Sequence, residues 1–120
     1  MNLNNFTIKA QEAIAAAQQL AFSNNNINIE TEHLLQALLQ EEDSPVDFLL
    51  KKNNVNVPHL ISKIDESITK LPKQSGGEAA QQVSRDFNNA LLKANASIKQ
   101  FNDEFVSVEH LLIGLLNTND

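Results

Sequence analysis

The chain contains an internal duplication. Residues 6–43 and 83–120 align without a gap at an offset of 77 positions, and ten of the 38 aligned pairs are identical. Both copies carry the pattern Glu-His-Leu-Leu-x-x-Leu-Leu, which begins at Glu32 in the first copy and at Glu109 in the second. Copies this similar fold as equivalent units that pack against each other. Because two copies are too few for an open solenoid, the sequence predicts one globule with pseudo-twofold symmetry, in which a partner would find a groove at the seam between the copies.

Small and aliphatic side chains must form the core. Apolar residues make up 42% of the 120 residues, but aromatic residues only 5%, with six Phe and neither Trp nor Tyr. Such a core suits closely packed helices, and the length predicts one domain. The fold class is therefore predicted as all-α, with two imperfect helical repeats. Apolar residues recur at the helical period in segments 5–22, 32–40, 45–52, 57–71, about 82–100, and a last one that carries Leu111 to Leu116.

Local signals predict where several of these helices begin and end. Ser44 precedes Pro45, and proline is favoured at the first helical position because its missing N–H costs nothing there. The run 23–26 is predicted to end the first helix, since Asn tolerates the left-handed conformation. The other predicted N-caps are Asn4, Asn56 and Ser107.

A Pro- and Gly-containing stretch divides the two copies. We predict repeat one at residues 1–71, a linker at 72–81 and a partial repeat two at 82–120. Counterparts of the third and fourth helices would need roughly 28 further residues, judging from 44–71 in the first copy. The second repeat is therefore expected to be truncated.

Charge and composition argue against several classes of partner. The net charge is −6 and the isoelectric point is about 4.9, which disfavours binding to nucleic acid phosphates. No apolar run approaches the roughly 20 residues of a membrane span, and the Asn-rich start does not resemble a signal peptide. The chain also lacks cysteine, which is compatible with a reducing compartment. We expect a soluble, cytoplasmic protein that binds neither nucleic acid nor membrane.

The sequence lacks the residue patterns that bind ATP or a metal ion. None of the three glycines, Gly76, Gly77 and Gly114, opens a phosphate-binding loop. Neither His33 nor His110 has a second His or Cys at ligand spacing on its helix, so both are predicted to be neutral packing groups. Because no nucleophile and base are paired either, we expect a non-catalytic domain without a cofactor or metal.

Four segments together resemble the amino-terminal domain of the Clp-family AAA+ unfoldases. The likeness covers the whole chain in order, and its linker and final segment are most similar to the ClpB disaggregases. The segments are Phe6-Thr7-x-Lys9-Ala10-x-x-Ala13-Ile14, Glu32-His33-Leu34-Leu35, Leu71-Pro72-Lys73-x-Ser75-Gly76 and Asp103-Glu104-Phe105-Val106-Ser107-Val108-Glu109-His110-Leu111-Leu112.

The resemblance implies a fold and a function. In this family the domain consists of two imperfect four-helix repeats, and it captures unfolded or aggregated polypeptide for threading by downstream ATPase modules. ATP and Mg²⁺ are then expected only in those modules. The parent protein is expected to be a homohexamer that works with a DnaK-type chaperone system, and the isolated domain is expected to be a monomer.

The same resemblance points to three polar residues that handle substrate. Thr7, Asp103 and Glu109 correspond to positions that matter for substrate handling in ClpB relatives. A structural interpretation is open for two of them, because Thr7 can cap its helix locally and Asp103 can neutralise a helix end.

An apolar surface is the physical basis for a polypeptide site. Leu91, Phe105, Val106 and His110 come from the fifth helix and the start of the sixth, and Phe105 is unusual in a polar connector. We predict that these residues form an apolar groove that binds polypeptide weakly and promiscuously. The alternative is that Phe105 and Val106 anchor the connector between the two helices in the core. An acidic rim of Asp103, Glu104 and Glu109 would favour apolar segments flanked by Lys or Arg.

Glu32 and Glu109 form a pseudo-symmetric pair. Each can simply complement the dipole in the first turn of its helix. Alternatively, they are matching cation receptors, since the corresponding acids of the related ClpC proteins receive phosphoarginine. The flanks here, 29–31 and 107–108, depart from the Gly-Thr of ClpC. An adaptor-docking or phosphoarginine-binding domain is therefore the second hypothesis, and a structural spacer is the third.

Overall fold

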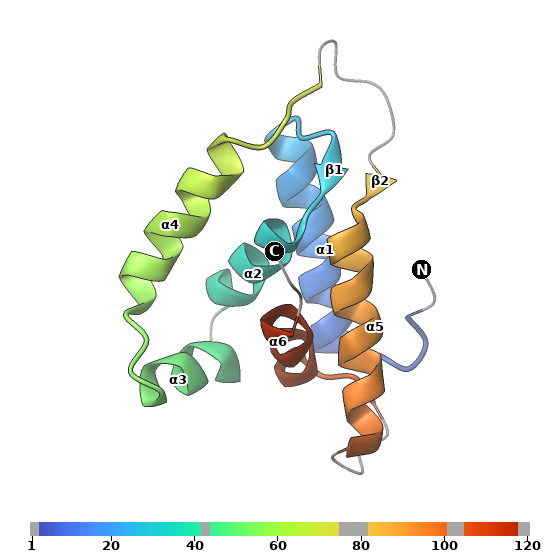
Figure 1. Ribbon diagram of the computed structural model, residues 1–120. Helices are drawn as coiled ribbons and strands as arrows, with labels where there is room; N and C mark the ends of the chain where they lie inside the picture. The colour runs from blue at the N-terminus through green and yellow to red at the C-terminus, as the bar shows by residue number, and fades with distance from the viewer. Residues whose placement is uncertain (1–2, 42–43, 75–81, 101–104, 118–120) are drawn as a thin grey trace.

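The computed structural model describes residues 3–41, 44–74, 82–100 and 105–117, and within these ranges the chain is helical as predicted. Two short strands accompany the helices (Figure 1). None of the helices in these ranges is both long and apolar enough to cross a bilayer. The elements are α1 (Ile8–Ser23), β1 (Asn28–Ile29), α2 (Thr31–Gln40), α3 (Pro45–Lys52), α4 (Val57–Thr69), β2 (Gln82–Val83), α5 (Arg85–Gln100) and α6 (Val108–Leu116).

The centre of the fold consists of two helix pairs. Each long helix packs most extensively on the shorter helix that follows it, α1 on α2 and α5 on α6, and the two pairs contact each other. Alanines on the buried side of α1 let these helices approach closely. Outside the pairs, α4 packs on α2, and α3 lies between α4 and α6 (Figure 1).

The two copies exchange backbone pairing. In the small parallel sheet Ile29 lies opposite Val83, and an isolated parallel bridge joins Phe6 to Val106. At the offset of 77 positions, Phe6 is equivalent to Val83 and Ile29 to Val106. In each copy, the segment before the long helix therefore pairs with the connector between the long and the short helix of the other copy. This is the pseudo-twofold relation that the duplication predicts.

Equivalent hydrogen bonds continue this exchange into the helix starts. The backbone N–H of Thr7 donates to the carbonyl of Val106 at 2.8 Å, and that of Ser84 donates to the carbonyl of Ile29 at 3.0 Å. The hydroxyl oxygens of Thr7 and Ser84 then accept from backbone N–H groups three residues on, as N-caps.

The exchange also explains why two predicted helix starts are wrong. Asn4 is not the N-cap of the first helix, because the segment before Ile8 pairs with the connector of the other copy. The fifth helix likewise begins at Arg85 and not near Gln82, since Gln82 and Val83 form β2. The residues just before α1 and α5 are extended because they pair with the backbone of the other copy, although their apolar period alone predicts a helix.

Caps that depend only on neighbouring residues are confirmed. Ser44 accepts a hydrogen bond from the N–H of Val46 and precedes Pro45, and Asn56 caps α4. Asn25 has a φ of 57°, so the first helix ends through the left-handed conformation that the sequence indicates. Ser107 caps α6 in the same local manner.

Parts of the predicted apolar stripes are exposed. Ile61 in α4 is 38% exposed and Leu116 in α6 is 72% exposed. Ile61 is partly exposed because it lines, with Leu39 of α2 and Ile64 of α4, a small open cavity of about 90 Å³ between these two helices. Leu116 is the last residue of α6 and lies one turn beyond the buried Leu112. Phe101, expected just past the fifth helix, lies outside the described residues.

Gly114 permits the close packing of α6 on α5. A Cβ atom at this position would lie 2.2 Å from the carbonyl oxygen of Ala90 and 3.0 Å from the backbone nitrogen of Ala94. These neighbours are backbone atoms of a packed helix, so they cannot move aside as a flexible side chain can. The second copy therefore needs glycine where the first copy has Ala37.

Gly114→Ala is expected to destabilise the fold by about 1–3 kcal/mol, because the added methyl group overpacks the α5–α6 contact. An unstrained Gly→Ala change in a helix would instead stabilise by about 0.5–1 kcal/mol. Urea unfolding followed by circular dichroism measures the difference. The control is Ala96→Gly, at an exposed position of α5, which measures the stability difference that helix propensity alone causes. A Gly114→Ala protein at least as stable as the wild type would contradict the packing described.

Candidate functional site

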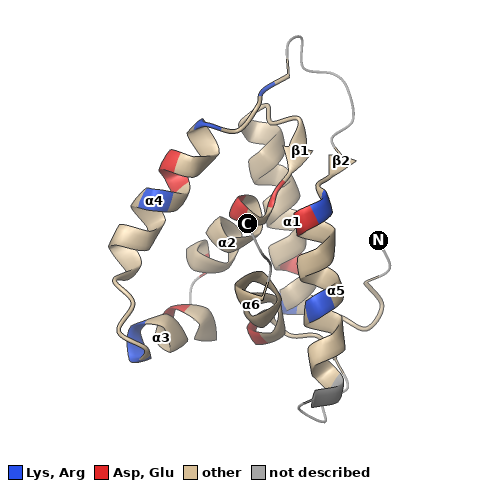
Figure 2. Cartoon of the chain, in the orientation of Figure 1, with Lys and Arg blue, Asp and Glu red and all other residues tan. Residues whose placement is uncertain are grey.

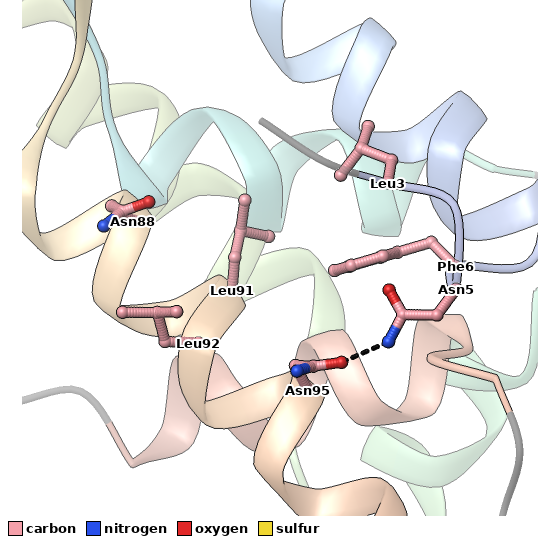
Figure 3. Close-up of a pocket in the computed structure, with 7 residues that line it drawn as sticks. All are labelled: Leu3, Asn5, Phe6, Asn88, Leu91, Leu92 and Asn95. Carbon is pink, nitrogen blue, oxygen red and sulfur yellow. Dashed lines mark hydrogen bonds between the residues drawn. The ribbon is translucent and has the colours of Figure 1, made fainter.

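A groove of about 440 Å³ lies at the seam between the two copies. It forms because the segment before α1 must lie beside α5 in order to reach Val106. The α5 residues that face it are spaced by three, one and three positions, so they share one side of the helix. The lining residues are Leu3, Asn5, Phe6, Asn88, Leu91, Leu92 and Asn95 (Figure 3).

The floor of the groove is apolar and only partly covered. Phe6 and Leu91 are each 6% exposed and belong to the core, and the ring of Phe6 extends toward Leu91 (Figure 3). Leu92, by contrast, is 59% exposed beside them. An exposed leucine next to buried apolar side chains offers an additional apolar group a place to bury its surface.

Amide side chains flank this floor. The Nδ2 of Asn5 donates a hydrogen bond to the Oδ1 of Asn95, which links the segment before α1 to α5 across one end of the groove (Figure 3). Asn88 lies two helical turns before Asn95 on α5. None of the seven described lining residues is ionisable, so the described lining combines apolar side chains with uncharged amides.

Of the four apolar-site residues expected from the sequence, only Leu91 lines the groove. Val106 is fully buried, because it holds the bridge to Phe6, and His110 is 6% exposed, because its ring caps the start of α6. Neither side chain is among the described lining residues of the groove, although both were expected to line it. Phe105 is 52% exposed, so it does not anchor the core, but it is not among the described lining residues.

None of the polar residues expected at the site is among the described lining residues of the groove. Thr7 is half-buried and caps α1. Glu32 and Glu109 occupy equivalent first-turn positions of α2 and α6, with Glu109 exposed and Glu32 half-buried. Asp103 and Glu104 lie outside the described residues. The acidic rim is therefore not part of the groove lining as described.

Six of the seven described lining residues were not expected at the site from the sequence, and of these Phe6 was named only in a segment that carries the family resemblance. Asn88, Leu92 and Asn95 lie with Leu91 at spacings typical of one helix side, and this is the sequence signal that could have found them. Leu3 and Asn5 gave no such signal. Their place depends on the exchange between the copies, which periodicity does not indicate.

A family model, that of the Clp repeat (R) N-terminal domain, matches residues 5–120. The chain belongs to this family. It is 40% identical over 116 residues to the chaperone protein ClpB of Bacteroides thetaiotaomicron, which covers 97% of this chain and 13% of that protein. This Clp repeat domain thus spans only a small part of the length of the ClpB relative.

Solved structures share the fold of this Clp repeat domain. The N-terminal domain of Hsp104 from Candida albicans superposes with a TM-score of 0.87 at 24% identity, over 96% of this chain and 75% of that one. A ClpV N-domain in complex with a VipB peptide superposes with a TM-score of 0.77 at 16% identity, over 97% of this chain and 72% of that one. The domain therefore has the fold of the Hsp104 and ClpV N-domains.

Histidines at equivalent positions stabilise both helix starts of this Clp repeat domain. The Nδ1 of His33 accepts a hydrogen bond from the N–H of Glu30 at 2.8 Å, and the Nδ1 of His110 accepts from the N–H of Ser107 at 2.9 Å. The Nε2 of His33 lies 2.8 Å from the Oδ1 of Asn26, so this nitrogen carries the proton. Among the described residues no cluster of three or more His, Cys, Asp or Glu side chains is placed to hold a metal ion.

Burial lowers the pKa of His33. The ring has no exposed surface, and desolvation of the charged form outweighs the carboxylate of Glu32 and the hydrogen bond from the backbone of Glu30, which both raise the pKa. Protonation would also place an N–H at Nδ1 against the donor N–H of Glu30. His33 is therefore neutral in the folded domain, as the sequence predicts.

The domain is expected to lose stability through His33 as the pH falls. Because the pKa is lowered from 6.5 on folding, this contribution is intact above about pH 6.5 and declines as the pH falls through the folded-state pKa. Urea unfolding of the wild type and of His33→Gln between pH 7.5 and pH 5 measures it, and the stability gap between them should shrink at low pH. His59→Gln, which removes an exposed imidazole, is the matched control. A gap for His33→Gln that does not change with pH would contradict this assignment.

Proposed function

We propose that this domain binds exposed apolar stretches of unfolded or aggregated polypeptide in the seam groove. The observation that carries the proposal is Leu92, an exposed leucine beside the apolar floor of Phe6 and Leu91. Such a floor makes few directional contacts, so binding is weak and tolerant of sequence. These are the properties required of a domain that receives many different clients.

The relatives support the same function. A ClpB relative is named a chaperone protein, and a ClpV N-domain of the same fold has been solved with a peptide. We propose that the parent of this domain is a ClpB-like, ATP-dependent disaggregase of the cytoplasm. In that proposal the domain has no catalytic role, and it passes clients to ATPase modules of a hexamer that works with a DnaK-type system.

The roles of the groove residues follow from their burial. Leu91 and Phe6 are held by the core, so they form a fixed floor and do not need to be ordered on binding. Leu92 supplies the exposed surface that a client covers. Thr7, Asp103, Phe105 and Glu109 remain proposed substrate-handling residues outside the described lining of this groove.

Leu92→Asp is expected to weaken binding of a permanently unfolded polypeptide by about tenfold, because it replaces apolar contact surface with a charge that must be desolvated. Fluorescence anisotropy of a labelled polypeptide measures the dissociation constant. The stability of the variant should change little, since Leu92 is exposed in the free domain.

The matched control is Leu116→Asp, the same change at a leucine that is 72% exposed and is not among the described lining residues. Its affinity should stay within about twofold of the wild type. Equal losses for the two variants, or none for Leu92→Asp, would refute this groove as the binding site.

A further inference from the structure

We infer that the seam groove holds its client by the peptide backbone, through Asn88 and the Asn5–Asn95 pair, and that it selects uncharged apolar segments. The inference rests on the proposed function and specifies the class of polypeptide that the groove takes. It differs from the acidic rim expected from the sequence, because the described lining contains three asparagines and no ionisable group.

The asparagines have hydrogen-bonding capacity that the fold does not use. The side chain of Asn88 makes no hydrogen bond to any other described residue, and the Asn5–Asn95 bond occupies one donor and one acceptor. A primary amide carries two N–H donors and a carbonyl acceptor. It therefore complements both polar groups of a peptide bond, whatever side chains the peptide carries.

The spacing of these amides suits a short extended segment. Asn88 and Asn95 are seven residues apart on α5, which corresponds to about 10 Å along a helix. An extended chain covers the same distance in about three residues. Leu91 and Leu92 lie between the two asparagines, so an apolar side chain of the client can contact the leucines while its backbone faces the amides.

The first copy already holds backbone carbonyls with an amide at the equivalent helix position, in the turn closed by the hydrogen bond from the N–H of Phe6 to the carbonyl of Leu3. Gln11 corresponds to Asn88 at the offset of 77 positions. Its Nε2 donates to the carbonyl of Phe6 at 2.9 Å and to that of Leu3 at 3.2 Å. In copy one this amide is thus occupied by the chain itself, whereas in copy two Asn88 faces the groove.

The charge distribution points the same way. Glu109 is exposed in the first turn of α6 and does not belong to the described lining. Acidic and basic residues elsewhere are interspersed over several helices (Figure 2). On α5 itself, Lys93 follows Leu92 but is not among the described lining residues, and its ammonium group donates to the carbonyl of Asn117.

Four labelled peptides with one shared apolar core test the inference on the full chain. Three carry Ser, Lys or Asp flanks, and the fourth has Ser flanks and esters in place of its two central amides, which removes two N–H donors. We expect the first three to bind within about twofold of one another at 50 and 300 mM NaCl. The ester peptide should bind about tenfold more weakly, as the loss of two hydrogen bonds predicts.

Two charge variants and one amide variant sharpen the test. Asn95→Asp keeps the acceptor for Asn5 and should create a two- to fivefold preference for Lys over Asp flanks, the range of about 0.5–1 kcal/mol for an exposed ion pair. Ala96→Asp adds the same charge at the next, exposed position and should create none. Asn88→Leu should bind the amide and ester peptides with more similar affinity than the wild type does.

Equal binding of the amide and ester peptides by the wild type would overturn the inference, as would a salt-dependent preference of fivefold or more for Lys flanks. Both results would leave the groove itself intact as a client site. Failure of all four peptides to bind would instead overturn the proposed function, and this inference with it.

Discussion

The reciprocal pairing between the two copies is the constraint on which the rest of the structure depends. The hydrogen bonds from Thr7 to Val106 and from Ser84 to Ile29 each contribute only about 1 kcal/mol net. Their larger effect is geometric, because they fix the segment before each long helix against the connector of the other copy. The helix starts, the orientation of α1 relative to α5 and the seam groove all follow from that placement.

The two halves are equivalent in fold but present different surfaces on their long helices. At the positions of Leu92 and Asn88 the first copy has Ala15 and Gln11. Alanine offers less apolar surface, and Gln11 is bonded to the chain before α1. An accessible apolar and amide surface is thus described on α5 of the second copy, and this is where we propose that a client binds.

Local structure was predictable from sequence wherever it depends on neighbouring residues. The helical period, the Ser44-Pro45 start and the left-handed exit at Asn25 all involve contacts within a few positions, and the structure confirms them. The start of α1 was not predictable in this way, because a bridge to Val106, about 100 residues away, decides it. For the same reason Leu3 and Asn5 were not predicted as groove residues, because what they face depends on the other repeat of the chain. Leu91 was the lining residue that the sequence predicted.

The central claim is that unfolded polypeptide enters the seam between the copies. Methyl NMR tests it most directly, with the leucine methyl groups of the chain labelled and an unlabelled unfolded polypeptide added. The resonances of Leu3, Leu91 and Leu92 are expected to shift in a saturable manner, while those of Leu49 in α3 and Leu60 in α4 are not. Shifts confined to the α3 and α4 leucines, or no shifts at saturating polypeptide, would contradict this claim.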